Sequence, residues 1–168
     1  GVIMITTKKG KDGTGRLSLS VNFSFQNATK KPALLNASQY AELNNEMMAN
    51  AGYDQNPLWT APSSLGNGTN WNDQIFRTGY LENYTLSYSG GSDKAHYYVS
   101  GGFLNQTGTV RSVSYRRYTF EANSDAQVLK WLKFSNSLAL SADVKKQGNY
   151  DLGSTYRALP IFPVKDEN

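Results

Sequence analysis

Cysteine is absent from this 168-residue sequence, and histidine occurs only once. The absence of cysteine excludes a disulfide framework and any cysteine-based metal centre. Only 18% of the residues are charged, yet no run of about 18 apolar residues occurs, which excludes a transmembrane helix. The net charge of +4 arises from lysines and arginines scattered over the chain, so we expect no nucleic-acid-binding surface.

Residues with the chemistry of a catalytic or metal site are also sparse. His96 has no cysteine partner and no clustered acid nearby in the sequence, which favours an ordinary strand-surface residue over a metal ligand or a catalyst. Glu42 and Glu46 are four residues apart, as on the solvated face of a helix. We therefore predict no enzymatic activity, no catalytic residues, no metal site and no cofactor.

Glycine and tyrosine are abundant instead, with 15 and 11 residues, in a background rich in serine, asparagine and threonine. This mixture is typical of β-strands joined by turns. The clearest strand covers residues 16–27, where apolar and polar residues alternate strictly. One face carries Leu17, Leu19, Val21, Phe23 and Phe25, and the other carries Ser18, Ser20, Asn22, Ser24 and Gln26.

Four further segments alternate in a similar way. They predict strands around residues 83–89, 97–103, 118–122 and 131–144. The intervening residues predict turns at 90–94 and 123–127 and a medium connection over 105–114. Asn136 occupies an apolar position of the last segment and marks either a β-bulge or a polar group near an interface. The sequence therefore predicts an all-β antiparallel meander.

Helical signals are confined to the stretch between the first two strands. Asn36 followed by Gln39 resembles a capping box, and Gly52 is placed to end a helix over residues 36–51. Residues 53–68 are irregular. A short capped turn is expected at 70–76, where the apolar side chains form a local packing cluster. This long connection thus carries a helix within a loop.

Two architectures fit the alternation. A membrane-spanning strand needs about 9 to 11 residues with one lipid-facing row, a length that 16–27 and 131–144 reach. Long and short connections alternate, as in outer-membrane barrels. The aromatic residues that flank the apolar centres, as in an interfacial girdle, are Tyr80, Tyr84, Tyr88, Tyr97, Tyr98, Tyr115, Tyr118 and Trp131. The alternative is a secreted soluble β-sandwich that binds carbohydrate or protein, with a core of Leu17, Val21, Phe23, Leu138 and Leu140.

A series of short motifs resembles one family. Residues 1–10 (GVIMITTKKG) are similar to the end of the plug in TonB-dependent transporters, especially the SusC/RagA family of Bacteroidetes. Four later motifs follow in the order expected for that family. They are NWNDQIFRTG at 70–79, NYTLSYSGGS at 83–92, YYVSGGF at 97–103 and YRRY at 115–118. The resemblance covers nearly the whole chain.

The resemblance implies a fold and a domain organisation. It makes the meander part of a transmembrane β-barrel of roughly 22 strands with a plugged lumen. Residues 1–10 would be the last strand of the plug domain, 11–15 a connector, and 16–168 the first barrel strands and extracellular loops. Residues 27–79 and the chain after 146 would be extracellular. Both ends are expected to continue into a longer protein.

The resemblance also implies a function and partners. The expected role is import of oligosaccharides or peptides across the outer membrane of a Gram-negative bacterium, in contact with its lipid. The expected partners are a SusD-like surface lipoprotein and the TonB complex, the latter bound through regions absent from this chain. Three aromatic residues in expected loops are candidates for stacking on a sugar ring, with loop packing as the alternative. They are Tyr53, Trp59 and Tyr150.

Overall fold

The computed structural model describes residues 1–2, 8, 10, 13–148 and 151–165. The chain divides into two compact units. The sheet unit comprises residues 1–26, 79–108 and 112–147, and the loop unit comprises residues 27–78, 109–111 and 148–168. The residues expected to form a plug strand, 1–10, lie outside the described part except for Gly1, Val2, Lys8 and Gly10.

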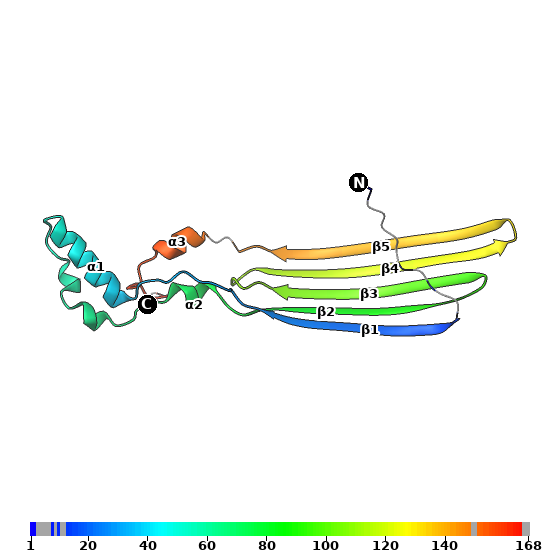
Figure 1. Ribbon diagram of the computed structural model, residues 1–168, viewed down its shortest axis with the longest axis horizontal. Helices are drawn as coiled ribbons and strands as arrows, with labels where there is room; N and C mark the ends of the chain where they lie inside the picture. Colours follow the sequence, from blue (N-terminus) through cyan, green and yellow to red (C-terminus); the bar gives the residue numbers. More distant parts are fainter. Residues whose placement is uncertain (3–7, 9, 11–12, 149–150, 166–168) are drawn as a thin grey trace. The chain divides into compact units, whose positions relative to one another are not determined.

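The sheet unit is a five-stranded antiparallel meander in which each strand pairs with its neighbours in sequence (Figure 1). The strands are β1 (Gly13–Gln26), β2 (Gly79–Ser92), β3 (Ala95–Thr107), β4 (Ser114–Leu129) and β5 (Leu132–Lys146). Each strand has 13 to 16 residues, whereas strands of about five or six residues are common in soluble proteins. The predicted all-β meander is confirmed.

The strand register places the apolar residues of all five strands on one face. Residues that lie directly opposite each other in an antiparallel pair project to the same side. The central row of this face consists of Leu19, Leu86, Gly101, Phe120 and Leu140. The next row consists of Val21, Tyr84, Phe103, Tyr118 and Ala142, and its rings lie 6.3 Å (Tyr84–Phe103) and 5.1 Å (Phe103–Tyr118) apart.

The opposite face is polar. One row consists of Arg16, Ser89, Tyr98, Asn123 and Ser137, and the next consists of Ser18, Ser87, Ser100, Glu121 and Ala139. Tyr98 and Tyr115 therefore lie on the polar face, so their assignment to an aromatic girdle with the outward tyrosines was wrong. The sheet thus separates into an apolar face and a polar face over all five strands.

The turn expected at residues 123–127 is also wrong. These residues belong to β4, and the hairpin turn lies at Lys130 and Trp131. Asn123 and Asp125 favour turns in general, but here they occupy polar-face positions and pair with strands on both sides, which overrides their local preference. At the other end of the sheet, β1 begins at Gly13, inside the expected connector.

Asn136 does not mark a bulge. The register between β4 and β5 is continuous here, and Asn136 lies opposite Ser124 on the apolar face. Of the two interpretations left open by the sequence, the β-bulge is therefore excluded, and a polar group near an interface stays a prediction. The adjoining residue of β3 is Tyr97, which makes this a polar and aromatic row.

The sheet unit has no covered apolar core among its described residues. The residues proposed as a sandwich core lie on one face, and Leu17 and Phe23 are 67% and 60% exposed. No second sheet is present in the described part of the chain to cover them. The β-sandwich alternative is therefore wrong, because its defining feature is a second layer that buries this face.

The loop unit contains the expected helices. They are α1 (Ala37–Asn50) and α2 (Trp71–Ile75), joined by the 3-10 turns η1 (Pro57–Trp59) and η2 (Pro62–Leu65). A further helix, α3 (Leu152–Arg157), was not predicted. The indole nitrogen of Trp71 donates to the carbonyl of Leu159 at 3.2 Å, and this bond holds α2 to a segment 88 positions away. Ile75, another member of the expected cluster, is buried. None of the helices in the described residues is long and apolar enough to cross a membrane.

The start of α1 is fixed by the predicted capping box. The Asn36 side-chain oxygen accepts from the Gln39 amide at 2.8 Å, and the Gln39 side chain accepts from the Asn36 amide at 3.1 Å. The helix ends before Gly52, whose φ of +75° suits glycine. These local signals explain why the sequence located this helix correctly.

Asn36→Ala is expected to destabilise α1 by about 1 kcal/mol, because it leaves the Gln39 amide in the first turn without its acceptor. Hydrogen exchange of the α1 amides in the parent protein measures this effect. Asn50→Ala, at the other end of the same helix, is the control and should change exchange little. Equal exchange rates in the wild-type and Asn36→Ala proteins would show that the cap does not stabilise the helix.

Candidate functional site

Polar residues border the central part of the apolar face at both ends. One boundary consists of Glu82, Asn105 and Arg116, where the Arg116 guanidinium donates to the Asn105 side chain at 3.2 Å. The other consists of Ser124 and Asn136 beside Tyr97. Phe23 and Val144 share the first of these rows, and Ala126 and Phe134 lie beyond the second, so the polar residues border the central part of the face without ending it.

The central part between these two polar rows is comparable in height to the apolar band of an outer-membrane barrel. On β4 the boundaries Arg116 and Ser124 are eight positions apart, which corresponds to roughly 27 Å at about 3.4 Å per residue. A strand tilt of about 40° reduces this to roughly 21 Å along the membrane normal, close to the apolar band of about 25 Å in outer-membrane barrels. Trp131 lies beyond the Ser124 boundary, in an exposed hairpin turn, as expected at a membrane interface.

The polar face carries a buried hydrogen-bond network centred on Asn123, which is only 5% exposed. Its side-chain nitrogen donates to the Lys8 carbonyl at 2.9 Å and to a carboxylate oxygen of Glu121 at 2.6 Å. Its oxygen accepts from the Ser137 hydroxyl at 2.7 Å. The network ties the main chain at Lys8 to β4 and β5.

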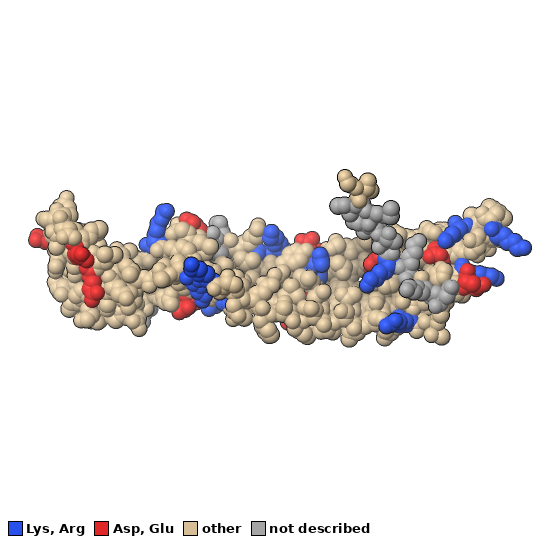
Figure 2. All heavy atoms as spheres, viewed as in Figure 1, with Lys and Arg blue, Asp and Glu red and all other residues tan. Residues whose placement is uncertain are grey.

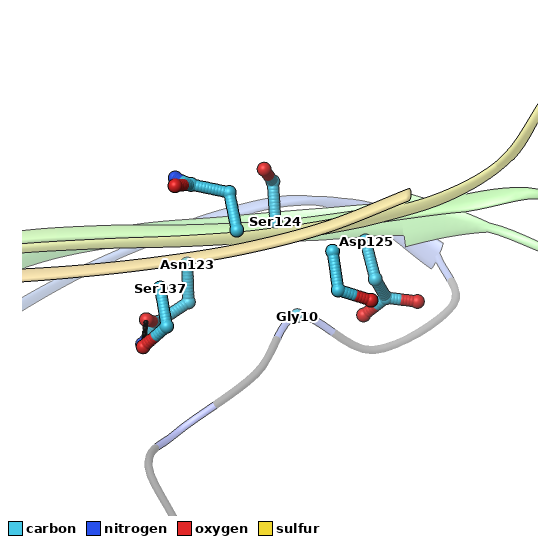
Figure 3. A pocket seen from close by; sticks show the side chains of 7 residues that line it. Gly10, Asn123, Ser124, Asp125 and Ser137 are labelled. Atoms are coloured by element: carbon cyan, nitrogen blue, oxygen red, sulfur yellow. Dashed lines mark hydrogen bonds between the residues drawn. The ribbon is translucent and has the colours of Figure 1, made fainter. Parts of the chain in front are cut away.

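A small cavity adjoins this network. It has a volume of about 140 Å³ and is lined by Gly10 and by residues of β4 and β5. Figure 3 shows Asn123, Asp125 and Ser137 on the side of the sheet where Gly10 lies, whereas Ser124 projects to the opposite side. The close-up thus shows the division into two faces at a single site.

His96 lies on the same polar face and takes part in an ion-pair cluster. Its Nδ1 is 3.1 Å from Asp125 Oδ2, and Lys133 Nζ is 3.6 Å from the same oxygen. The expected strand-surface position is confirmed, but its acidic partner, 29 positions away, was not predicted, because only the β3–β4 register brings the two together. Among the described residues, no three His, Cys, Asp or Glu side chains converge as metal ligands would.

Charges of both signs occur on the described surface. In the face shown in Figure 2, lysine and arginine side chains are interspersed with aspartate and glutamate. Glu42 and Glu46 are exposed on α1, as expected for a solvated helix face.

The candidate stacking residues Tyr53 and Trp59 have different surroundings in the structure. Tyr53 is 70% exposed after α1, and Trp59 packs edge-on against Tyr40 at 5.8 Å between ring centroids. The Trp59 carbonyl also accepts from the side chain of Asn45 at 2.8 Å. Tyr150 lies outside the described residues. Stacking on a sugar ring stays a prediction for all three, and the contacts of Trp59 favour loop packing for that residue.

The loop unit contains a cavity that the sequence did not predict. It has a volume of about 520 Å³, and its lining is rich in amide side chains, including Asn36, Asn67, Asn70 and Asn72, together with Asp73. The Asn72 side-chain nitrogen donates to the Pro32 carbonyl at 2.8 Å, which ties α2 to the chain that leads into α1. Amide groups both donate and accept hydrogen bonds, so this cavity suits a polar ligand.

The start of α3 depends on an ionised carboxylate. The hydroxyl of Ser154 and the backbone amide of Gly153 donate to Asp151 and lower its pKa below the ordinary value of 3.8. Because the pKa is lower in the folded state, this cap is fully effective above pH 3.8 and is lost as the pH falls through the folded-state pKa.

Hydrogen exchange of α3 is therefore expected to accelerate as the pH falls below 3.8, once the intrinsic pH dependence of exchange is removed. Asp151→Asn is the matched control, because asparagine retains an acceptor for the Gly153 amide but does not titrate in this range. An acceleration of the same size in the Asp151→Asn variant would show that the carboxylate of Asp151 is not responsible.

Comparisons with known proteins identify relatives of the chain. No family model matches it. It is 35% identical over 133 residues to TonB-dependent receptor P3 of Formosa agariphila, which covers 79% of this chain and 12% of that protein. It is 34% identical over 125 residues to TonB-dependent receptor SusC of Bacteroides thetaiotaomicron, which covers 73% of this chain and 12% of that protein.

The fold also matches solved structures. The chain superposes on part of the RagAB peptide importer in its closed-closed state with a TM-score of 0.70 and 18% identity, over 86% of this chain and 19% of that chain. The open-open state of the same importer gives a TM-score of 0.70 and 19% identity. At this identity the likeness concerns the fold alone. The chain spans less than a fifth of the length of these proteins.

Proposed function

Because the chain belongs to the SusC/RagA family of TonB-dependent receptors, we propose that its parent protein imports oligosaccharides or peptides across the outer membrane of a Gram-negative bacterium. The observation that carries this proposal is the five-stranded meander whose long strands expose one continuous apolar face. In this role, the apolar face contacts lipid and the polar face lines the plugged lumen.

The two units take separate roles in this proposal. Strands β1 to β5 form part of the barrel wall, which begins at Gly13 rather than at the expected Arg16. Residues 1–10 are the end of the plug. The connections that form the loop unit leave the sheet at the end opposite the two short hairpins, which is the extracellular end in barrels of this kind.

The proposed partners follow from the same assignment. A SusD-like lipoprotein caps the barrel on the extracellular side, and the TonB complex supplies energy through regions of the parent protein outside this chain. The RagAB complex, whose solved structures share this fold, is a peptide importer, which supports peptides as one substrate class. The amide-lined cavity and exposed Tyr53 of the loop unit would suit either peptides or sugars.

Uptake by cells with and without the parent gene tests this function. Fluorescently labelled oligosaccharides and peptides are supplied separately, with and without an uncoupler of the proton gradient. We expect deletion of the gene to abolish uptake of one of the two substrate classes, and the uncoupler to abolish the same uptake in wild-type cells. Unchanged uptake of both classes in the deletion strain would contradict the proposal.

A further inference from the structure

Asn123 uses every hydrogen-bonding group of its side chain. Its two N–H groups have acceptors in Lys8 and Glu121, and its oxygen accepts from Ser137. The Glu121 and Ser137 contacts come from β4 and β5, so they fix the orientation of the amide independently of the segment before β1. The remaining N–H is thereby aimed at a main-chain carbonyl, that of Lys8.

Gly10 lies against the backbone of the sheet two residues further on. A Cβ atom at this position would collide with the carbonyl oxygens of both Gly90 and Tyr97 and would lie 2.7 Å from the Tyr97 nitrogen. These atoms belong to paired residues of β2 and β3 and cannot move without breaking the ladder. Only glycine therefore allows the chain to approach the wall this closely.

The two contacts recognise the same segment from different strands. Asn123 binds a carbonyl from β4, while Gly10 fits against β2 and β3. Neither contact involves the side chain of Lys8, which is exposed. Recognition at these two residues depends on the main chain and on the absence of a side chain.

We propose that Asn123 and Gly10 form a clip that holds the segment before β1 against the barrel wall, with Asn123 as its positioning residue. This inference rests on the proposed function, in which residues 1–10 end the plug and the polar face lines the lumen. The clip fixes the point at which the plug joins the wall. Movement of the plug during import is then confined to the part that precedes Lys8.

Mobility of a spin label at position 8 tests the clip in the intact parent protein in outer membranes. Lys8→Cys carries the label, with any cysteine elsewhere in the parent replaced. Asn123→Leu keeps the size of the side chain but removes its hydrogen bonds. We expect the population of the mobile component to rise about fivefold in this variant, as for the loss of one typical net hydrogen bond.

Two further variants separate the clip from a general loss of structure. Gly10→Ala should also mobilise the label, because its methyl group collides with the β2–β3 backbone. Asn83→Leu, on the polar face of β2, is the matched control and should leave the label immobile. Resistance of the folded barrel to unfolding in SDS without heating verifies that each variant retains its wall.

The outcomes distinguish this inference from the proposed function. An immobile label in a folded Asn123→Leu barrel would overturn the clip, as would equal mobilisation by Asn83→Leu. Lipid accessibility at Val21, measured in the same membranes, reports on the wall itself. If Val21 is accessible to lipid but the mobility of the label is unchanged in the Asn123→Leu variant, only the clip is refuted. If Val21 is not accessible to lipid, the transporter assignment on which the clip depends is refuted.

Discussion

Leu19→Arg is expected to lower the stability of the folded barrel of the parent protein in the membrane. Leu19 lies in the central row of the apolar band, with Leu86 as its neighbour on β2. An arginine at the bilayer midplane of a barrel costs about 2–4 kcal/mol. This cost corresponds to a decrease in the folding equilibrium of between about 30-fold and about 900-fold.

Ser20→Arg is the matched control for this substitution. Ser20 is the next residue of β1 but lies on the polar face, in a row with Thr85 and Gly102. The arginine there remains in a polar environment, so most of the protein should insert. Heat-modifiable mobility of the outer-membrane fraction on SDS gels measures the folded population. Equal losses in both variants would contradict the assignment of the two faces.

The isolated 168-residue chain is expected to associate in water rather than remain monomeric. Its apolar face is exposed, and β1 and β5 each pair with only one neighbour among the described strands, which leaves an open edge on both sides of the sheet. Exposed apolar patches and unpaired edges both promote association. Detergent micelles cover the apolar face, so a larger monodisperse fraction is expected in their presence.

Size-exclusion chromatography with light scattering measures this difference. The elution profile of the purified chain is compared in buffer alone and in buffer with a mild detergent. A quadruple substitution of the central row, Leu19, Leu86, Phe120 and Leu140 to serine, is the matched control and should reduce association in water. A monodisperse, cooperatively melting monomer of the unmodified chain in water would count strongly against the barrel.

Local and periodic signals predicted much of this structure correctly. The capping box of Asn36 and Gln39 located α1, because the helix start is determined by residues three positions apart. Strict alternation located β1 from residue 16 onwards. The turn at 123–127 was wrong because polar residues occupy half of the strand positions in a sheet with one polar face. On such a face, asparagine, serine and aspartate do not indicate a turn as they usually do.

The contacts of the polar face could not be predicted from the sequence. Asn123 reaches a carbonyl 115 positions away, and His96 meets Asp125 across the β3–β4 pair. The His96–Asp125 contact depends on the register of β3 and β4, which the sequence did not determine because it placed a turn at residues 123–127. The Asn123 contact joins β4 to a residue outside the strands, which no periodic pattern predicts. Helix α3 was missed because it has only six residues, although Asp151 supplied a capping signal.

The most direct test of the membrane assignment compares Val21 and Asn22, two adjacent residues on opposite faces of β1. The chain has no cysteine, so Val21→Cys and Asn22→Cys each place a single fluorescent probe within this segment of the parent protein in membranes. A lipid-borne quencher should strongly reduce the fluorescence at position 21 and have little effect at position 22. Equal protection of both positions from the quencher would mean that the apolar face does not contact lipid, and the transporter assignment would have to be withdrawn.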